Sequence, residues 1–214
     1  MNNVYENDMR FVPFLKFIEK YKNILILLAV ILVGAVSYFV VNNQIEKKKS
    51  EQAALVYKEW LEEISQENPD NESLNNLLHK FLKDYKNTGY TQLALLSKAN
   101  LDANSDNYKD SLDNFNKLVE ITNGINGSKI YNKIARVSAS RLLFSMDKHD
   151  EAIEMIDLYS SSDTNGYIHE LTGDILLEQG KIDLAISQYE KAANKYTDES
   201  SQTIVAMKIS NIDM

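Results

Sequence analysis

The chain has 214 residues and no cysteine, which excludes a disulfide framework, a Cys-ligated metal site and a lipid attached to cysteine. It has only two prolines and seven glycines, and so few helix breakers favour long helices over many short strands. Residues 50–214 hold 16 basic and 27 acidic residues, and this acidic balance disfavours binding to nucleic-acid phosphates.

The first predicted element is a membrane-spanning helix over residues 24–41, ILILLAVILVGAVSYFVV. These 18 consecutive uncharged positions approach the length that spans a bilayer, and no polar face interrupts them. A cleaved signal peptide is the alternative, because Ala35-Val36-Ser37 has small residues at the spacing of a cleavage site. The apolar run continues past Ser37 to Val41, and the preceding segment is long for a signal peptide. We therefore expect one uncut anchor.

Basic residues lie on both sides of this span, so their number does not decide its orientation. They are Arg10, Lys16, Lys20 and Lys22 before it, and Lys47, Lys48 and Lys49 after it. The segment before the span has apolar residues at helical spacing, which fits either a short interfacial helix or an extension of the spanning helix. After the span no breaker occurs before Asn68-Pro69. We expect the helix to continue to about residue 66, with Trp60 in a core.

The last third of the chain has the clearest repeat. Its order of small, large, turn, small, large and small residues is typical of a tetratricopeptide (TPR) helix pair. The residues that form this order are Gly173, Leu176, Gly180, Ala185, Tyr189 and Ala192. Small residues let two antiparallel helices approach closely, so we expect Gly173 to face Ala185. Gly180 is expected in the turn, where glycine relieves the strain of a helix end.

The same order recurs twice upstream, with more departures each time. The second copy consists of Ser140, Leu143, Ala152 and Ile156, and Ala152 lies 33 positions before Ala185. The third copy consists of Ala99, Ser111 and Phe115, but Asp102 stands where a large apolar residue is expected. This copy is longer by a turn-rich insert at 123–128.

Two further apolar stripes at helical spacing flank the repeats, from Leu74 to Tyr85 and from Ile204 to Ile209; the second is expected to cap the open end of a solenoid. The predicted fold is therefore all-α, a single transmembrane helix followed by a TPR-like α-solenoid of helix pairs. An ordinary helical bundle with chance spacing is the alternative. The expected division is an N-terminal segment 1–23, a span 24–41, a helical stalk 42–68 and a TPR-like domain 69–214.

Three segments and the early span resemble the YfgM family, ancillary subunits of the bacterial SecYEG translocon. The segments are Val4-Tyr5-Glu6-Asn7-Asp8, Gly173-Asp174-Ile175-Leu176-Leu177-x-x-Gly180 and Met207-Lys208-Ile209-Ser210-Asn211-Ile212. The likeness covers nearly the whole chain, although the weak third repeat and the Asn-rich loops depart from better-formed members.

The resemblance implies an inner-membrane protein with a cytoplasmic N-terminus and a periplasmic repeat domain. It also implies association with the SecYEG translocon and with a PpiD-like periplasmic chaperone, and a role in helping newly translocated proteins leave the channel and fold. A membrane-tethered adaptor for another envelope complex, such as the division machinery, is the alternative. Exposed Tyr and Asn residues on the first helix of each pair are candidates for partner binding by geometry alone, and no individual partner-binding residue is predicted.

An enzyme is the least favoured class, because the sequence has no nucleophile-elbow, phosphate-loop or metalloprotease motif. No catalytic residue, cofactor or small-molecule substrate is predicted, and His79, His149 and His169 lack partners at metal-ligand spacing. The acidic residues from Asp102 to Asp113 mimic a calcium loop. Asn107 replaces its glycine, however, so we expect a polar turn that caps the next helix.

Overall fold

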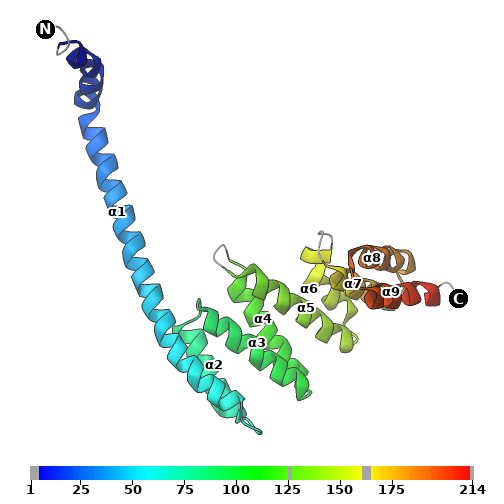
Figure 1. The fold of residues 1–214 in the computed structure, drawn as a ribbon. Helices are drawn as coiled ribbons and strands as arrows, with labels where there is room; N and C mark the ends of the chain where they lie inside the picture. Colours follow the sequence, from blue (N-terminus) through cyan, green and yellow to red (C-terminus); the bar gives the residue numbers. More distant parts are fainter. Residues whose placement is uncertain (1–4, 125–126, 161–164, 213–214) are drawn as a thin grey trace. The chain divides into compact units, whose positions relative to one another are not determined.

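The computed structural model describes residues 5–124, 127–160 and 165–212, and their regular structure consists of nine helices and no strand (Figure 1). The predicted all-α fold is thus confirmed. The helices are α1 Tyr5–Ile64, α2 Asn71–Asp84, α3 Gly89–Asn104, α4 Tyr108–Thr122, α5 Lys129–Ser145, α6 His149–Ser160, α7 Gly166–Glu178, α8 Ile182–Lys195 and α9 Glu199–Ile212. The chain forms two compact units, Met1–Gln52 and Ala53–Met214.

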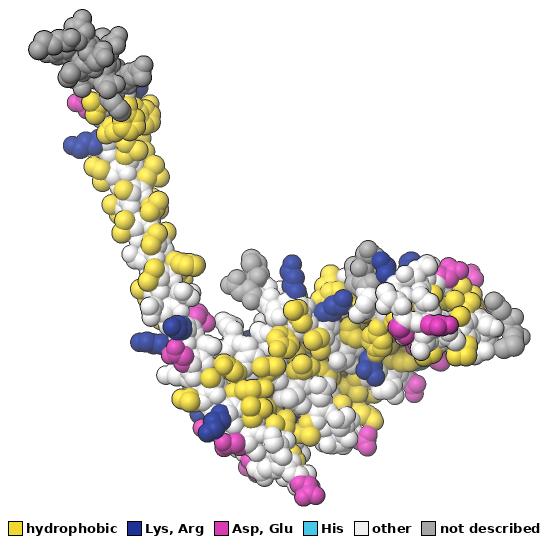
Figure 2. Space-filling model, viewed as in Figure 1, with side chains coloured by type: hydrophobic (Ala, Val, Ile, Leu, Met, Phe, Trp, Pro, Cys, Tyr) yellow, Lys and Arg dark blue, Asp and Glu magenta, His cyan; other side chains and the backbone are white. Residues whose placement is uncertain are grey.

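The first unit is the long N-terminal part of α1. All side chains from Ile24 to Val41 are exposed, and the most apolar stretch of the helix has a mean hydropathy of 3.0 (Figure 2). By length and composition this helix is able to cross a membrane. Because α1 begins at Tyr5 and has no break, the segment before the predicted span extends the same helix and is not a separate interfacial helix.

The last turns of α1 belong to the second unit. Ala53, Val56 and Trp60 are buried there. The Trp60 indole N–H donates a hydrogen bond to Ser97 Oγ at 3.1 Å, and its ring lies edge-on to Phe81 with centroids 6.2 Å apart. Trp60 is therefore a core residue, as predicted, and it joins the end of α1 to α2 and α3.

The rest of the second unit is a stack of helix pairs. Each helix from α2 to α9 packs on the next one, and α5 also contacts both α3 and α7. The pairs are therefore α3–α4, α5–α6 and α7–α8, and their first helices stack on one another, as in a solenoid. Apolar side chains fill the inside of each pair; Phe115, Ile156 and Tyr189 are examples from the three second helices. Helix α9 covers the last pair and buries Val205, as predicted for a capping helix.

The turn inside each pair has the same geometry. Asp106, Asp147 and Gly180 have positive φ values of 60°, 57° and 71°. After each of them, the next N–H donates a hydrogen bond to a carbonyl five residues earlier, for example Lys181 N–H to Leu176 O at 2.9 Å. This is the Schellman ending of a helix, which glycine or a short polar side chain can adopt. Residues 125 and 126 of the predicted insert lie outside the described residues.

Candidate protein-interaction surface

The residues predicted to pack the repeats all lie at the centres or turns of the three pairs. Gly180 occupies the left-handed turn, and the other twelve are buried. The buried set is Ala99, Ser111, Phe115, Ser140, Leu143, Ala152, Ile156, Gly173, Leu176, Ala185, Tyr189 and Ala192. They hold the scaffold together, so a partner must bind elsewhere on the surface.

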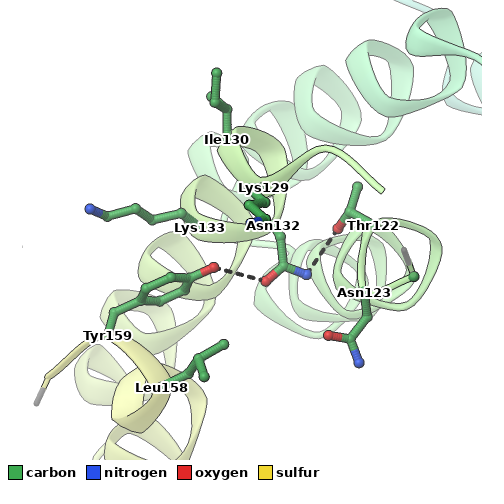
Figure 3. A pocket seen from close by; sticks show the side chains of 9 residues that line it. Thr122, Asn123, Lys129, Ile130, Asn132, Lys133, Leu158 and Tyr159 are labelled. Carbon is green, nitrogen blue, oxygen red and sulfur yellow. Dashed lines mark hydrogen bonds between the residues drawn. The ribbon is translucent and has the colours of Figure 1, made fainter. Parts of the chain in front are cut away.

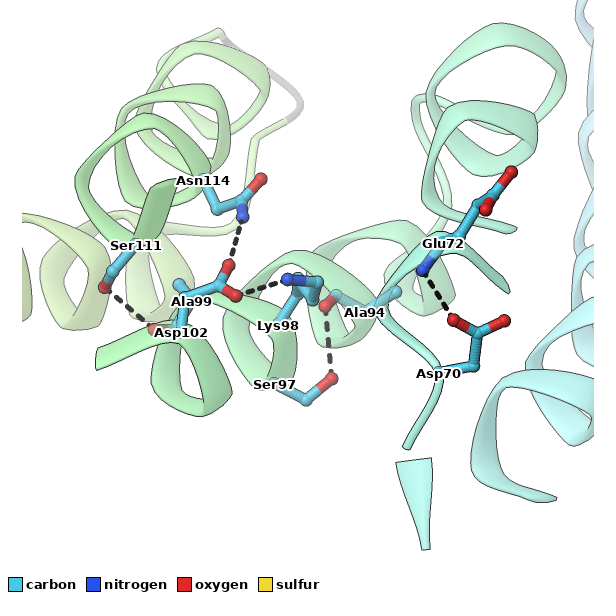
Figure 4. Close-up of polar contacts among 9 residues, drawn as sticks. All are labelled: Asp70, Glu72, Ala94, Ser97, Lys98, Ala99, Asp102, Ser111 and Asn114. Carbon is cyan, nitrogen blue, oxygen red and sulfur yellow. Dashed lines mark hydrogen bonds and ion pairs between the residues drawn. The ribbon is translucent and has the colours of Figure 1, made fainter. Parts of the chain in front are cut away.

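Two of the small residues are serines whose hydroxyls are satisfied across the helix pair. Ser111 on α4 donates to the Ala99 carbonyl on α3 at 2.8 Å (Figure 4), and Ser140 on α5 donates to the Ala152 carbonyl on α6 at 2.8 Å. A buried hydroxyl that lacks a partner would destabilise the core, and these hydrogen bonds remove that cost. Serine therefore serves as the small residue in the first two pairs.

In the last pair, the nearest neighbour of Gly173 on α8 is Tyr189 and not the predicted Ala185. The atoms that a Cβ on Gly173 would meet first belong to the ring of Tyr189, at 2.6 Å. The Tyr189 hydroxyl donates to Asp174 Oδ1 at 2.8 Å. Burial, together with this hydrogen bond, raises the pKa of Tyr189 above its ordinary value. Gly173 thus makes room for an aromatic ring.

A group of charged and hydroxyl side chains fastens α9 to α7. Lys208 Nζ lies 2.6 Å from Asp174 Oδ1 and 2.7 Å from Glu170 Oε1. The Tyr196 hydroxyl donates to Glu170 Oε2 at 2.6 Å, and burial together with this hydrogen bond raises the pKa of Tyr196. Burial lowers the pKa of Lys208, but the hydrogen bonds with Asp174 and Glu170 outweigh burial, so that this pKa is raised overall.

Asp102, which breaks the apolar pattern of the third copy, is buried in a polar network (Figure 4). One of its oxygens contacts Lys98 Nζ, and the other accepts a hydrogen bond from Asn114 Nδ2 at 3.0 Å. The Tyr108 hydroxyl donates to Asp106 Oδ1 at 2.7 Å. The carboxylate of Asp102 is therefore engaged by side chains of α3 and α4. Among the residues that the structure describes, no cluster of metal-ligand side chains forms.

The three histidines lie on three different helices, α2, α6 and α7. His79 is exposed on α2, and His149 is half-buried beside the ring of Phe144, with centroids 5.6 Å apart. His169 is buried in α7, and its Nδ1 is 2.8 Å from Gln188 Oε1. The rings of His149 and His169 are thus each held in a separate helix contact.

The exposed surface of the stacked first helices is the candidate binding surface. On α5, Ile130 is 71% exposed and Ile134 is 39% exposed, and Arg141 continues the same helical stripe opposite the buried side. On α7, Tyr167 is 38% exposed, and the Arg141 guanidinium carbon lies 5.9 Å from the centroid of its ring. The two helices therefore offer one continuous surface with apolar, aromatic and basic groups.

Sequence reasoning proposed only exposed Tyr and Asn residues for this role and missed the stripe on α5. Tyr167 fits that proposal, and Asn100 and Asn104 are exposed on α3. Asn132 on α5 is buried instead, because it bonds to the neighbouring helices. In the sequence, Ile130 and Ile134 have the apolar character of core residues, and only the packing shows that they are exposed.

Comparison with known proteins agrees with the repeat geometry. No curated protein matches the chain significantly. A family described as tetratricopeptide repeat-like domain matches residues 16–214, which include both the apolar helix and the stacked pairs. The chain therefore belongs to the tetratricopeptide repeat-like domain family.

Proposed function

We propose that this protein is a membrane-anchored, non-enzymatic scaffold of the SecYEG translocon that helps newly translocated proteins together with a PpiD-like periplasmic chaperone. The observation that carries the proposal is the continuous exposed stripe of α5 and α7, because a stack of helix pairs with an open apolar surface is suited to holding another protein. Repeat domains of this family are typical interaction modules, which supports a scaffold over an enzyme.

The anchor is the second part of the proposal. We assign residues 24–41 to the membrane, 1–23 to the cytoplasm, and residues 42–214, which include the stalk and the repeat domain, to the periplasm. Helix α1 passes without a break from the apolar residues into the core at Trp60, which supports a direct link between membrane and scaffold. A tethered domain meets membrane partners at a high effective concentration, so weak contacts are sufficient.

The translocon enters the proposal through the sequence resemblance to the YfgM family. The segment at 173–180 supplies the buried glycine and the left-handed turn of the last pair, and the segment at 207–212 supplies Lys208, which fastens the cap. These two segments of the resemblance therefore both lie in the last helix pair and its capping helix.

Site-specific crosslinking in intact cells tests this function. A photoreactive residue at Ile134 probes the exposed stripe, and one at Leu184, which is 56% exposed on α8, is the matched control. After extraction in mild detergent, mass spectrometry identifies the crosslinked proteins. We expect SecYEG and a PpiD-like chaperone from Ile134 in clear excess over Leu184. Division proteins in their place would support the alternative adaptor, and equal yields from both positions would contradict the assigned surface.

A further inference from the structure

Helix α5 is a basic helix in an acidic domain. It contains four of the 16 basic residues of the 50–214 region, namely Lys129, Lys133, Arg136 and Arg141, and none of its 27 acidic residues. No acidic residue occurs between Glu120 and Asp147. An acidic partner is therefore repelled by most of the domain and attracted to this helix.

A pocket of about 640 Å³ opens at the N-terminal end of α5 (Figure 3). We call it the α5 pocket; its lining is Thr122, Asn123, Gly124, Lys129, Ile130, Asn132, Lys133, Leu158 and Tyr159. Ile130 and Leu158 are 71% and 61% exposed, so the pocket offers apolar surface that the fold does not use. Ile130 also begins the stripe described above, and the pocket is thus one end of the candidate surface.

The floor of the pocket is held in place by Asn132. Its amide nitrogen donates to Thr122 Oγ1 on α4 at 3.1 Å, and its amide oxygen accepts from the Tyr159 hydroxyl on α6 at 3.1 Å (Figure 3). The same amide oxygen also accepts from Arg136 Nε at 3.1 Å. One buried amide therefore links three helices around the pocket. A pocket that is already formed costs little ordering free energy when a ligand binds.

Two lysines, Lys129 and Lys133, place positive charge at the pocket. Lys133 Nζ lies 5.7 Å from the centroid of the Tyr159 ring, which holds the ammonium group beside the apolar wall. Within the part of the chain that the structure describes, neither Lys129 nor Lys133 is paired with a carboxylate. The pocket thus combines apolar surface with two lysine ammonium groups that can attract a carboxylate.

We propose that the α5 pocket binds a short peptide segment of a partner protein in which apolar side chains alternate with carboxylates. An apolar side chain fills the space between Ile130 and Leu158, and adjacent carboxylates meet Lys129 and Lys133. From Ile130 to Arg141 the helix rises about 16 Å, so an extended segment of about five residues spans the stripe. The inference rests on the proposed function and specifies the chemistry of the partner.

Fluorescence anisotropy with the full-length protein in nanodiscs of zwitterionic lipid tests the proposal. The probe is a fluorescein-labelled peptide with alternating Leu and Asp residues. We expect saturable binding that weakens with added salt and is lost when Asn replaces Asp or Ser replaces Leu in the peptide. The double variant K129Q/K133Q should weaken binding at least about fivefold, and Leu158→Ser should do the same by removing apolar surface.

The matched control is the double variant K80Q/K191Q, which removes two exposed lysines from α2 and α8 and should bind like the parent protein. Equal loss in both double variants would overturn the site, since net charge alone would explain the binding. No binding up to about 1 mM peptide would also overturn it and would leave the crosslinking test of the translocon unaffected. Loss of peptide binding in nanodiscs of anionic lipid would indicate that the lysines bind a membrane surface, and it would overturn the proposal of a peptide ligand.

Discussion

The ring of Tyr189 on α8 rests on Gly173 of α7, where a Cβ would stand 2.6 Å from the ring carbon Cε1. The hydroxyl of the same ring is fixed by Asp174 at 2.8 Å. Held at both ends, the ring has little freedom to move aside. A second tyrosine repeats the arrangement: a Cβ on Gly166 would meet the Tyr196 ring at 2.9 Å, and the Tyr196 hydroxyl bonds to Glu170. Glycines of α7 therefore determine how closely the last pair packs.

Gly173→Ala is expected to destabilise the domain by about 1–3 kcal/mol, the usual cost of an extra methyl group in a filled core. The midpoint of urea unfolding, followed by far-UV circular dichroism in mild detergent, measures it. Gly89→Ala is the matched control, because a Cβ there meets nothing within 4 Å, and this change should be neutral or stabilising. Combining Gly173→Ala with Tyr189→Leu should cost less than the sum of the two single changes. Strict additivity would contradict the contact.

Lys208→Met is expected to loosen α9 without unfolding the other pairs. The change removes the cation between Asp174 and Glu170 and leaves two carboxylates facing each other, at a cost of about 1–2 kcal/mol. Hydrogen exchange at neutral pH should show faster exchange of the α9 amides and unchanged exchange in α3 to α6. Lys191→Gln, an exposed lysine on α8, is the control that should leave exchange unchanged. Uniformly faster exchange would mean that the contacts of Lys208 stabilise the whole domain and not α9 alone.

Alkaline pH is expected to weaken the same contacts of Lys208 with Asp174 and Glu170, together with the hydrogen bond of Tyr189. The pKa values of Lys208 and Tyr189 are both raised in the fold, so both groups hold their protons more tightly there than in the unfolded chain. Their stabilising effect is complete below about pH 10, where the unfolded groups are still protonated, and is lost as pH rises through the folded-state pKa values. Thermal unfolding from pH 7 to 11 should show a decline above about pH 10. A Lys208→Met, Tyr189→Phe double variant should decline less steeply, and an identical slope would contradict this origin.

The buried network at Asp102 predicts strong coupling. Lys98→Met leaves the Asp102 carboxylate without its cation in the core and is expected to destabilise the domain by about 3–5 kcal/mol. Replacing both members with apolar residues, Lys98→Met with Asp102→Leu, should recover much of this loss, because no charge then remains buried. Chemical denaturation of the single and double variants decides between these outcomes. A double variant no better than Lys98→Met would show that Asn114, rather than the ion pair, carries the network.

The order of helices and the centres of the pairs were readable in the sequence, because small and large residues recur at a fixed spacing along helices. The continuation of α1 beyond the span was readable for the same kind of reason, since no breaker occurs between Val41 and Asn68-Pro69. The turns at Asp106 and Asp147 were not, because an aspartate in the left-handed region is recognised only from its backbone. Residue spacing predicts which side of a helix is buried, and it does not predict which residues of another helix that side contacts.

Polar contacts between different helices account for the features of the structure that the sequence did not predict. Lys208 reaches Asp174, 34 positions earlier, and Asn132 joins Thr122 to Tyr159 through one amide. In the sequence these were isolated polar residues with no motif. The candidate surface was hidden for a related reason: Ile130 and Ile134 look like core residues of α5 until the packing shows that its core side is already filled.

In the proposed function, an uncut apolar helix holds the repeat domain at the membrane. Intact-mass spectrometry of the protein extracted from washed membranes of its own cells tests this most directly. We predict a species that retains residues 24–41 and the segment before them, up to the full 24.4 kDa. A mature protein that begins after Ser37 and is recovered in the soluble fraction would contradict a membrane anchor.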